Sequence, residues 1–269
     1  MTTTKTLAIV GVVVVVIAIV AYQFTGQEDP TMPRIEAKSA NTLSKLPDFA
    51  KIADVKEKKE TFFTTLYPII EEENQHIMKL RSALIALNDI PFVDLAPKQL
   101  AYISDVAKYY RADDAINKNT ITQLLERVDI IPPSLALTQA AIESGWGSSR
   151  FSKQGNNLFG QWCFSKGCGM VPSSRDSGKA HEVAKFKSVN AAVRGYLKNL
   201  NTNSAYQKLR DKRAQIRKSD GEVTGIALAQ TLTEYSEERE KYITKVSKFI
   251  NQNKLQRFTK QFEESLKAA

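Results

Sequence analysis

The sequence predicts a mainly α-helical fold that contains one small β-hairpin. Two observations lead to this prediction. From about residue 55 onward, most segments carry apolar residues at the spacing of one helical face. Between residues 169 and 188 the pattern changes, because a Ser-Gly turn signal separates short β-like pieces such as "HEVAKF". The 269 residues are enough for one main domain with a buried core, preceded by a shorter helical region.

The N-terminus contains a long apolar run. Residues 7–22, "LAIVGVVVVVIAIVAY", carry no charge and follow Lys5. As a helix they span about 24 Å, close to a bilayer core of about 30 Å once neighbouring residues are included. A cleaved signal peptide is the alternative, although the run is long for one and no A-x-A site follows. Because Glu28 and Asp29 lie beyond the run, we expect residues 1–25 to form a single-pass inner-membrane anchor, with the C-terminal domain in the periplasm.

The region after this anchor changes character twice. Residues 26–54 mix Pro, Ser, Asn and Thr with charged residues, which predicts a flexible linker. Residues 55–112 are expected to be helical. Their first helix, over 55–87, is either continuous or broken near Pro68. A second helix fits residues 97–110.

The remaining residues, 113–269, form the predicted main domain. A helix fits residues 120–129. Another begins at Pro133, a residue favoured at the first helical position, and ends where Gly145 can form a left-handed cap. After the hairpin, helical spacing returns in four segments, 189–201, 205–218, 223–235 and 242–266.

The formal net charge of +9 favours an anionic partner, for which nucleic acid, a membrane surface and a bacterial cell wall are candidates. Export of the chain makes nucleic acid an unsuitable partner. The basic segment "QKLRDKRAQIRK", residues 207–218, is then either solvated surface or a site of attraction to anionic wall peptides or phospholipid headgroups.

The two cysteines, Cys163 and Cys168, lie close together in "CFSKGC". In an exported chain this spacing predicts a small loop-closing disulfide, with free thiols as the alternative. A zinc site would need further ligands, and His76 and His181 are the two histidines of the chain. We therefore expect neither a metal nor another cofactor.

One carboxylate stands out because its position is unfavourable. Glu143 lies in the last turn of the helix that begins at Pro133, where the helix dipole opposes a negative charge by about 0.3–1 kcal/mol. Trp146 and the apolar helix face should also disfavour the charged form and so raise the pKa of Glu143 toward the range of a general acid. Lysozyme holds a glutamic acid against a tryptophan for this purpose. The alternative is a surface glutamate that follows an alanine-rich helix.

The neighbouring motifs distinguish these interpretations. "AAIESGWGSSRFSKQGNNLFG" resembles the N-acetylglucosaminidase family of bacterial cell-wall hydrolases, which includes the flagellar-rod hydrolase and Gram-positive autolysins. The resemblance covers about residues 120–250. Residues 143–147 resemble the family's catalytic-acid motif, residues 157–160 its NLFG signature, and Tyr235 with Tyr242, more loosely, its later tyrosine motif. The preceding helices and the cysteine pair are most similar to the Bax-type branch.

The resemblance implies a lysozyme-like α-lobe with a groove that binds glycan. Aromatic residues of this region are candidates for stacking on sugars, and nearby amides for bonding sugar hydroxyl or acetamido groups, although each alone is also typical of a core. The candidate substrate-binding residues are Trp146, Asn157, Phe159, Tyr196 and Tyr235, with Asn156, Gln161 and Trp162 as further possibilities.

The family's second carboxylate has no clear counterpart. Asp176 and Glu182 are the acids between Cys163 and Phe186, and Glu182 ranks first because its strand leads into "AKF". A second carboxylate would act as an inverting base or a nucleophile, whereas substrate assistance by the 2-acetamido group needs Glu143 alone.

The resemblance thus implies a peptidoglycan hydrolase that cleaves the β-1,4 bond between N-acetylglucosamine and N-acetylmuramic acid, with Glu143 as general acid. A lytic transglycosylase is one alternative, because it also uses a single glutamate on a lysozyme-like lobe. A non-catalytic protein that binds or organises peptidoglycan is the other.

Overall fold

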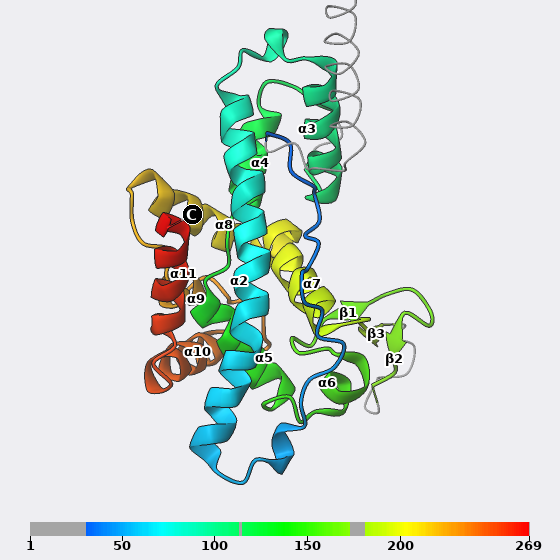
Figure 1. Cartoon of the computed structure of the whole chain (residues 1–269), viewed down its shortest axis with the longest axis vertical. Coiled ribbons are helices and arrows are strands. Elements are labelled where there is room, and N and C mark those ends of the chain that lie inside the picture. Colours follow the sequence, from blue (N-terminus) through cyan, green and yellow to red (C-terminus); the bar gives the residue numbers. More distant parts are fainter. Residues whose placement is uncertain (1–30, 113–114, 173–180, 269) are drawn as a thin grey trace, which may run out of the picture.

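The structure, a computed structural model, describes residues 31–112, 115–172 and 181–268 (Figure 1). The expected anchor over residues 1–25 and the candidate Asp176 lie outside these ranges. Within them, no helix combines the length and the apolar character that a membrane span requires. The described chain is mainly helical with one small sheet, as predicted.

The longest helix, α2 (Val55–Asn88), runs through the middle of the molecule (Figure 1). Asp54 begins it by accepting a hydrogen bond from the Glu57 N–H at 2.7 Å. The helix is continuous through Pro68, so the alternative of a broken pair is wrong. Pro68 is on the exposed face, where water can hydrate the Thr64 carbonyl that loses its partner.

The helix α2 packs against helices on both sides of residue 150 in the predicted main domain. Its partners are α4 (Thr120–Arg127), α5 (Pro133–Ser144), α7 (Val189–Thr202) and α11 (Gln256–Ala268). The helix α3 (Pro97–Tyr109) packs on α4 at one end of the molecule (Figure 1). A single hydrophobic cluster joins these elements.

Residues 31–54, which we call the N-terminal strap, differ from the expected flexible linker. The strap lies along α2 and α7 and is drawn in blue in Figure 1. The Val189 N–H donates to the Leu43 carbonyl at 2.8 Å, and the Leu43 N–H donates to Asn190 Oδ1 at 2.9 Å. Phe49, in the short helix η1 (Phe49–Lys51), is buried against Phe62. The composition is that of a linker, but a few spaced apolar and amide contacts hold the strap in place.

Short helices connect the longer elements. Gly145 ends α5 in the predicted left-handed conformation, with φ 56°. An unpredicted helix, α6 (Arg150–Gly155), follows, because Ser149 caps its first turn. Two other short helices, η2 (Phe92–Asp94) and η3 (Ser204–Tyr206), connect longer ones.

The predicted hairpin is part of a three-stranded antiparallel sheet in the order β1-β3-β2. Its strands are β1 (Trp162–Cys163), β2 (Gly169–Met170) and β3 (Glu182–Ala184). Gly169 pairs with Ala184, and a Cβ at this glycine would overlap the Val183 carbonyl oxygen, so the close strand approach requires glycine.

The C-terminal segments differ in length from the predictions. Of residues 223–235, five form helix α9 (Gly225–Ala229). The segment 242–266 contains the break between α10 (Glu240–Gln252) and α11, where Lys254 has φ 52°. The helix α8 (Gln207–Lys218) agrees closely with its prediction.

The basic segment of α8 is not simply a solvated surface. Arg210 and Arg213 are each 1% exposed. The buried Asp129 accepts from Arg217 Nη2 at 2.8 Å and lies 3.7 Å from Arg213 Nε and 3.6 Å from Arg81 Nη1. The three arginines of this segment therefore contribute to packing between the helices, and its lysines do not take part in these contacts.

Candidate active site

Glu143 lies in the last turn of α5 and faces α10, which packs against α5. Its Oε1 accepts a hydrogen bond of 2.8 Å from the hydroxyl of Tyr242 on α10. Burial raises the pKa of Glu143 and outweighs the opposing effects of the Tyr242 hydrogen bond and of the positive charge on Lys245, while Glu238 acts with the burial. The raised pKa favours the protonated acid, in the direction that the sequence predicts.

Trp146 occupies a different environment from the one expected. Its ring packs against Phe62, Phe63 and Phe249, with ring centroids 5.5, 5.3 and 5.4 Å away. The ammonium group of Lys59 lies over the same ring. Trp146 thus stabilises the junction of α2 and α10 instead of presenting a free aromatic face for a sugar.

A buried series of hydrogen bonds continues from Tyr242 into the core. Gln139 Nε2 donates to the Tyr242 hydroxyl oxygen at 3.0 Å, and the Tyr196 hydroxyl donates to Gln139 Oε1 at 2.5 Å. All three side chains are at most 2% exposed. We refer to Tyr196, Gln139 and Tyr242 as the buried relay. Gln139 was not among the predicted site residues, although its position four residues before Glu143 places it on the same helix face.

The family-like motifs meet around this relay. The Tyr235 ring stacks on Tyr242 with centroids 5.4 Å apart, and its hydroxyl donates to the Phe159 carbonyl at 3.2 Å. The Phe159 ring stacks on Tyr196 at 4.0 Å. Phe159 and Tyr196 are buried, so they support the site from behind, while Tyr235 is partly exposed beside Glu143's partner.

Asn157 also has a structural role. Its Nδ2 donates to the carbonyls of Gln161 and Ala184 at 2.8 and 3.0 Å. Its Oδ1 accepts from the backbone N–H groups of Phe159 and Gln161. These bonds shape the NLFG loop, and they engage the polar atoms that we expected to contact substrate.

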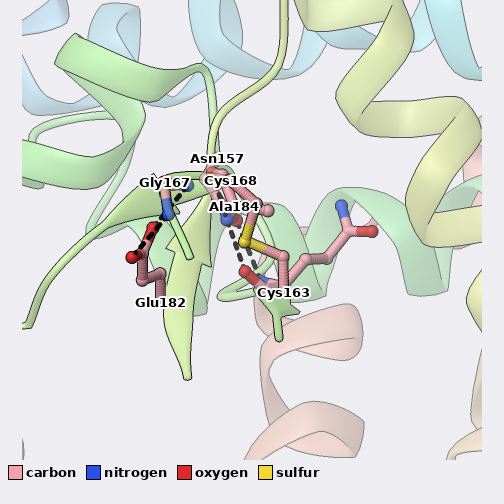
Figure 2. The surroundings of a disulfide bond; sticks show 8 residues. Asn157, Cys163, Gly167, Cys168, Glu182 and Ala184 are labelled. Atoms are coloured by element: carbon pink, nitrogen blue, oxygen red, sulfur yellow. Dashed lines mark hydrogen bonds between the residues drawn. A yellow bond between two sulfur atoms is a disulfide. The ribbon is translucent and has the colours of Figure 1, made fainter. Parts of the chain in front are cut away.

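Figure 2 shows that Glu182 turns toward the cysteine loop. Its carboxylate accepts from the N–H groups of Gly167 and Gly169 at 2.9 and 2.8 Å, and the side chain is buried. Cys163 and Cys168 are joined in a disulfide that closes this loop, with a Cα–Cα distance of 6.2 Å. Glu182 therefore acts as an acceptor for the loop backbone.

The same three residues are a possible metal-ligand group by distance. The ligand atoms of Cys163, Cys168 and Glu182 lie within 4.8 Å of one another. However, the two sulfur atoms are bonded to each other, so they are not thiolate ligands. Nearby, the His181 ring stacks on the exposed Trp162 at 4.1 Å, which occupies one face of this tryptophan.

We expect Glu182→Gln to destabilise the protein by about 1–3 kcal/mol, because an amide cannot accept both glycine N–H bonds and one partly buried donor loses its partner. Thermal unfolding measures this loss, and Glu234→Gln on an exposed side chain is the matched control. If Glu182 serves the loop alone, glycan cleavage by the folded variant should fall modestly. A severe loss of cleavage with unchanged stability would contradict this structural role.

Comparisons with known proteins identify the family to which these motifs belong. Over residues 118–255 the chain matches the family model described as mannosyl-glycoprotein endo-beta-N-acetylglucosaminidase, so it belongs to the glucosaminidase family. It is a Bax-type member: it is 39% identical over 208 residues to the protein bax of Escherichia coli (strain K12), covering 77% of this chain and 73% of that protein. No solved structure matches the chain significantly.

Proposed function

We propose that the protein is a peptidoglycan hydrolase that cleaves the β-1,4 N-acetylglucosaminyl bond of glycan strands, with Glu143 as the general acid. One observation carries this proposal: the family's acid, NLFG and tyrosine motifs converge on a partly buried glutamate whose pKa is raised by burial. A raised pKa keeps a larger share of the carboxyl protonated, in the direction that the general acid of a glycosidase requires.

In the proposed reaction, the carboxylic acid of Glu143 transfers its proton to the glycosidic oxygen as the bond to the anomeric carbon breaks. The acetamido oxygen of the sugar attacks the anomeric carbon as that bond breaks and closes a ring on the sugar. Water then opens the ring at the anomeric carbon and returns a proton to the Glu143 carboxylate. The bonds of Glu182 to the cysteine loop support this route over one that uses Glu182 as a base or nucleophile. Asp176 stays a candidate from the sequence.

Digestion of purified sacculi by the full-length protein, solubilised in a mild detergent, tests the proposal. Mass spectrometry of the released fragments should show new reducing ends at N-acetylglucosamine. Anhydro-muramic ends would instead identify a lytic transglycosylase, and binding to sacculi without released fragments would identify a non-catalytic binding protein. Either result would overturn the proposed hydrolysis.

We also propose that residues 1–25 anchor the protein in the inner membrane and that the C-terminal domain faces the periplasm. The support is the uncharged run over residues 7–22, with Lys5 before it and Glu28 and Asp29 after it. The full-length protein should therefore fractionate with the inner membrane, and protease added to spheroplasts should remove its C-terminus. Recovery of full-length protein in the soluble cytoplasmic fraction would contradict this topology.

A further inference from the structure

The donor and the acceptor of each hydrogen bond in the buried relay follow from the chemistry of its side chains. A tyrosine hydroxyl carries one proton, and its oxygen can also accept. Because Gln139 Nε2 donates to the Tyr242 oxygen at 3.0 Å, the proton of Tyr242 points away from Gln139. Glu143 Oε1, 2.8 Å from the same hydroxyl, receives it. The orientation of the Gln139 amide thus decides where the Tyr242 proton lies.

Tyr196 in turn sets the orientation of that amide. Its hydroxyl donates to Gln139 Oε1, and within the described part of the chain this is the one hydrogen bond that the hydroxyl makes. If the amide were reversed, its NH2 group would face Tyr196, and the buried proton of Tyr196 would lose its acceptor. An unsatisfied buried donor is unfavourable, so Tyr196 selects the orientation in which Gln139 donates to Tyr242.

We propose that Tyr196 and Gln139 are positioning residues that hold the hydroxyl proton of Tyr242 on Oε1 of Glu143, so that the acid proton of Glu143 occupies Oε2. Oε1 accepts from Tyr242, and the carbonyl oxygen of a carboxylic acid accepts more strongly than its hydroxyl oxygen, so this bond favours the acid proton on the other oxygen. Oε2, the oxygen that Tyr242 does not bind, is therefore the one that delivers the proton to substrate. The catalytic part of this inference rests on the proposed function, whereas the hydrogen-bond directions can be measured in the free protein.

The other groups that act on Glu143 do not obscure such a measurement. The charged ones are Lys245 and Glu238, which form an ion pair of 3.9 Å and have opposite effects on the pKa of Glu143. The titratable ones are tyrosines whose own pKa values burial raises above the ordinary value of 10.0, so they stay neutral while Glu143 titrates; they are Tyr196, Tyr206, Tyr235 and Tyr242.

The first test titrates the Glu143 carboxyl carbon by 13C NMR in detergent-solubilised, 13C-glutamate-labelled full-length protein, with Glu143→Gln to assign the signal. Tyr242→Phe should raise the pKa of Glu143, because the Tyr242 hydrogen bond lowers it. Gln139→Met and Tyr196→Phe should raise it as well but by less, since each weakens the donation by Tyr242. Tyr110→Phe, at a buried tyrosine outside the relay, should leave the titration unchanged.

Unchanged titration in both Gln139→Met and Tyr196→Phe, alongside a shift in Tyr242→Phe, would overturn the relay. Thermal unfolding shows whether each variant is folded. If Gln139→Met fails to fold, Tyr196→Phe carries the test, because it keeps the ring and removes the hydroxyl alone. The double variant should match Gln139→Met, since both substitutions act through one amide.

The second test measures sacculus digestion by the same variants against pH. Gln139→Met should lower kcat by about tenfold with KM unchanged, a smaller loss than the about 10²–10⁴-fold typical of losing a general acid. The alkaline limb of its pH profile should move to higher pH as the pKa of Glu143 rises. Shifted titrations with digestion at the parent's rate would overturn the role in catalysis. Absence of digestion by the parent would refute the proposed function. The hydrogen-bond directions of the relay would then be tested by the titration alone.

Discussion

Glu143→Gln should reduce sacculus digestion by about 10²–10⁴-fold while the protein keeps its fold, because the amide has the size of the acid but no transferable proton. The amide oxygen can still accept from Tyr242, so the hydrogen bond of 2.8 Å at this position survives. Release of soluble fragments from sacculi measures the loss. Glu237→Gln, on an exposed side chain before α10, is the matched control and should digest like the parent.

The stability of Glu143→Gln should equal that of the parent or exceed it by up to about 1 kcal/mol, since the change removes a charge from the C-terminal end of α5. The pKa of Glu143 is raised in the folded state, so the parent loses stability as the pH rises from the unfolded value through the folded one. The variant lacks this loss, and its advantage should therefore emerge as the pH increases. Digestion at the parent's rate would show that Glu143 is not the acid.

Asp129→Asn should destabilise the protein by about 3–5 kcal/mol, the largest change in stability that we expect, because it leaves buried arginines without their counter-charge. Arg213 is 1% exposed, and although burial lowers its pKa to about 10, its guanidinium is still charged at neutral pH. The neutral amide of the variant could not balance this charge or form the charged pair with Arg217. Denaturant unfolding measures the difference, and Asp211→Asn, on the exposed face of α8, should change stability by less than about 0.5 kcal/mol.

The effect of Asp129 should depend on pH in a defined direction. Burial alone would raise the pKa of Asp129, but Arg213, Arg217 and Arg81 together hold it below its ordinary value. A carboxyl with a lowered folded pKa contributes its full stabilisation above the unfolded pKa of about 3.9. That stabilisation declines as the pH falls toward the folded pKa. The gap between parent and Asp129→Asn should thus narrow below about pH 4, and a gap that is constant over this range would contradict the ion network.

Local features of the fold could be predicted from the sequence because short stretches carry their signals. The helix that begins at Pro133 and its left-handed cap at Gly145 depend on backbone preferences of those residues. The direction of the pKa shift at Glu143 also follows from its place in a buried apolar helix. The predicted pairing of Cys163 with Cys168 needs a separation of five residues only, which a single loop provides.

Other features depend on partners far apart in the chain, and the tertiary structure alone decides them. Gln139 meets Tyr242 across 103 residues, and Arg213 meets the Asp129 carbonyl across 84, so neither an amide in an alanine-rich helix nor a basic run shows its buried role locally. The strap is a similar case, since Leu43 bonds Asn190 across 147 residues. The physical reason is that burying a polar group requires a specific partner. Only the packing of α5 on α10, of α4 on α8 and of the strap on α7 brings those partners together.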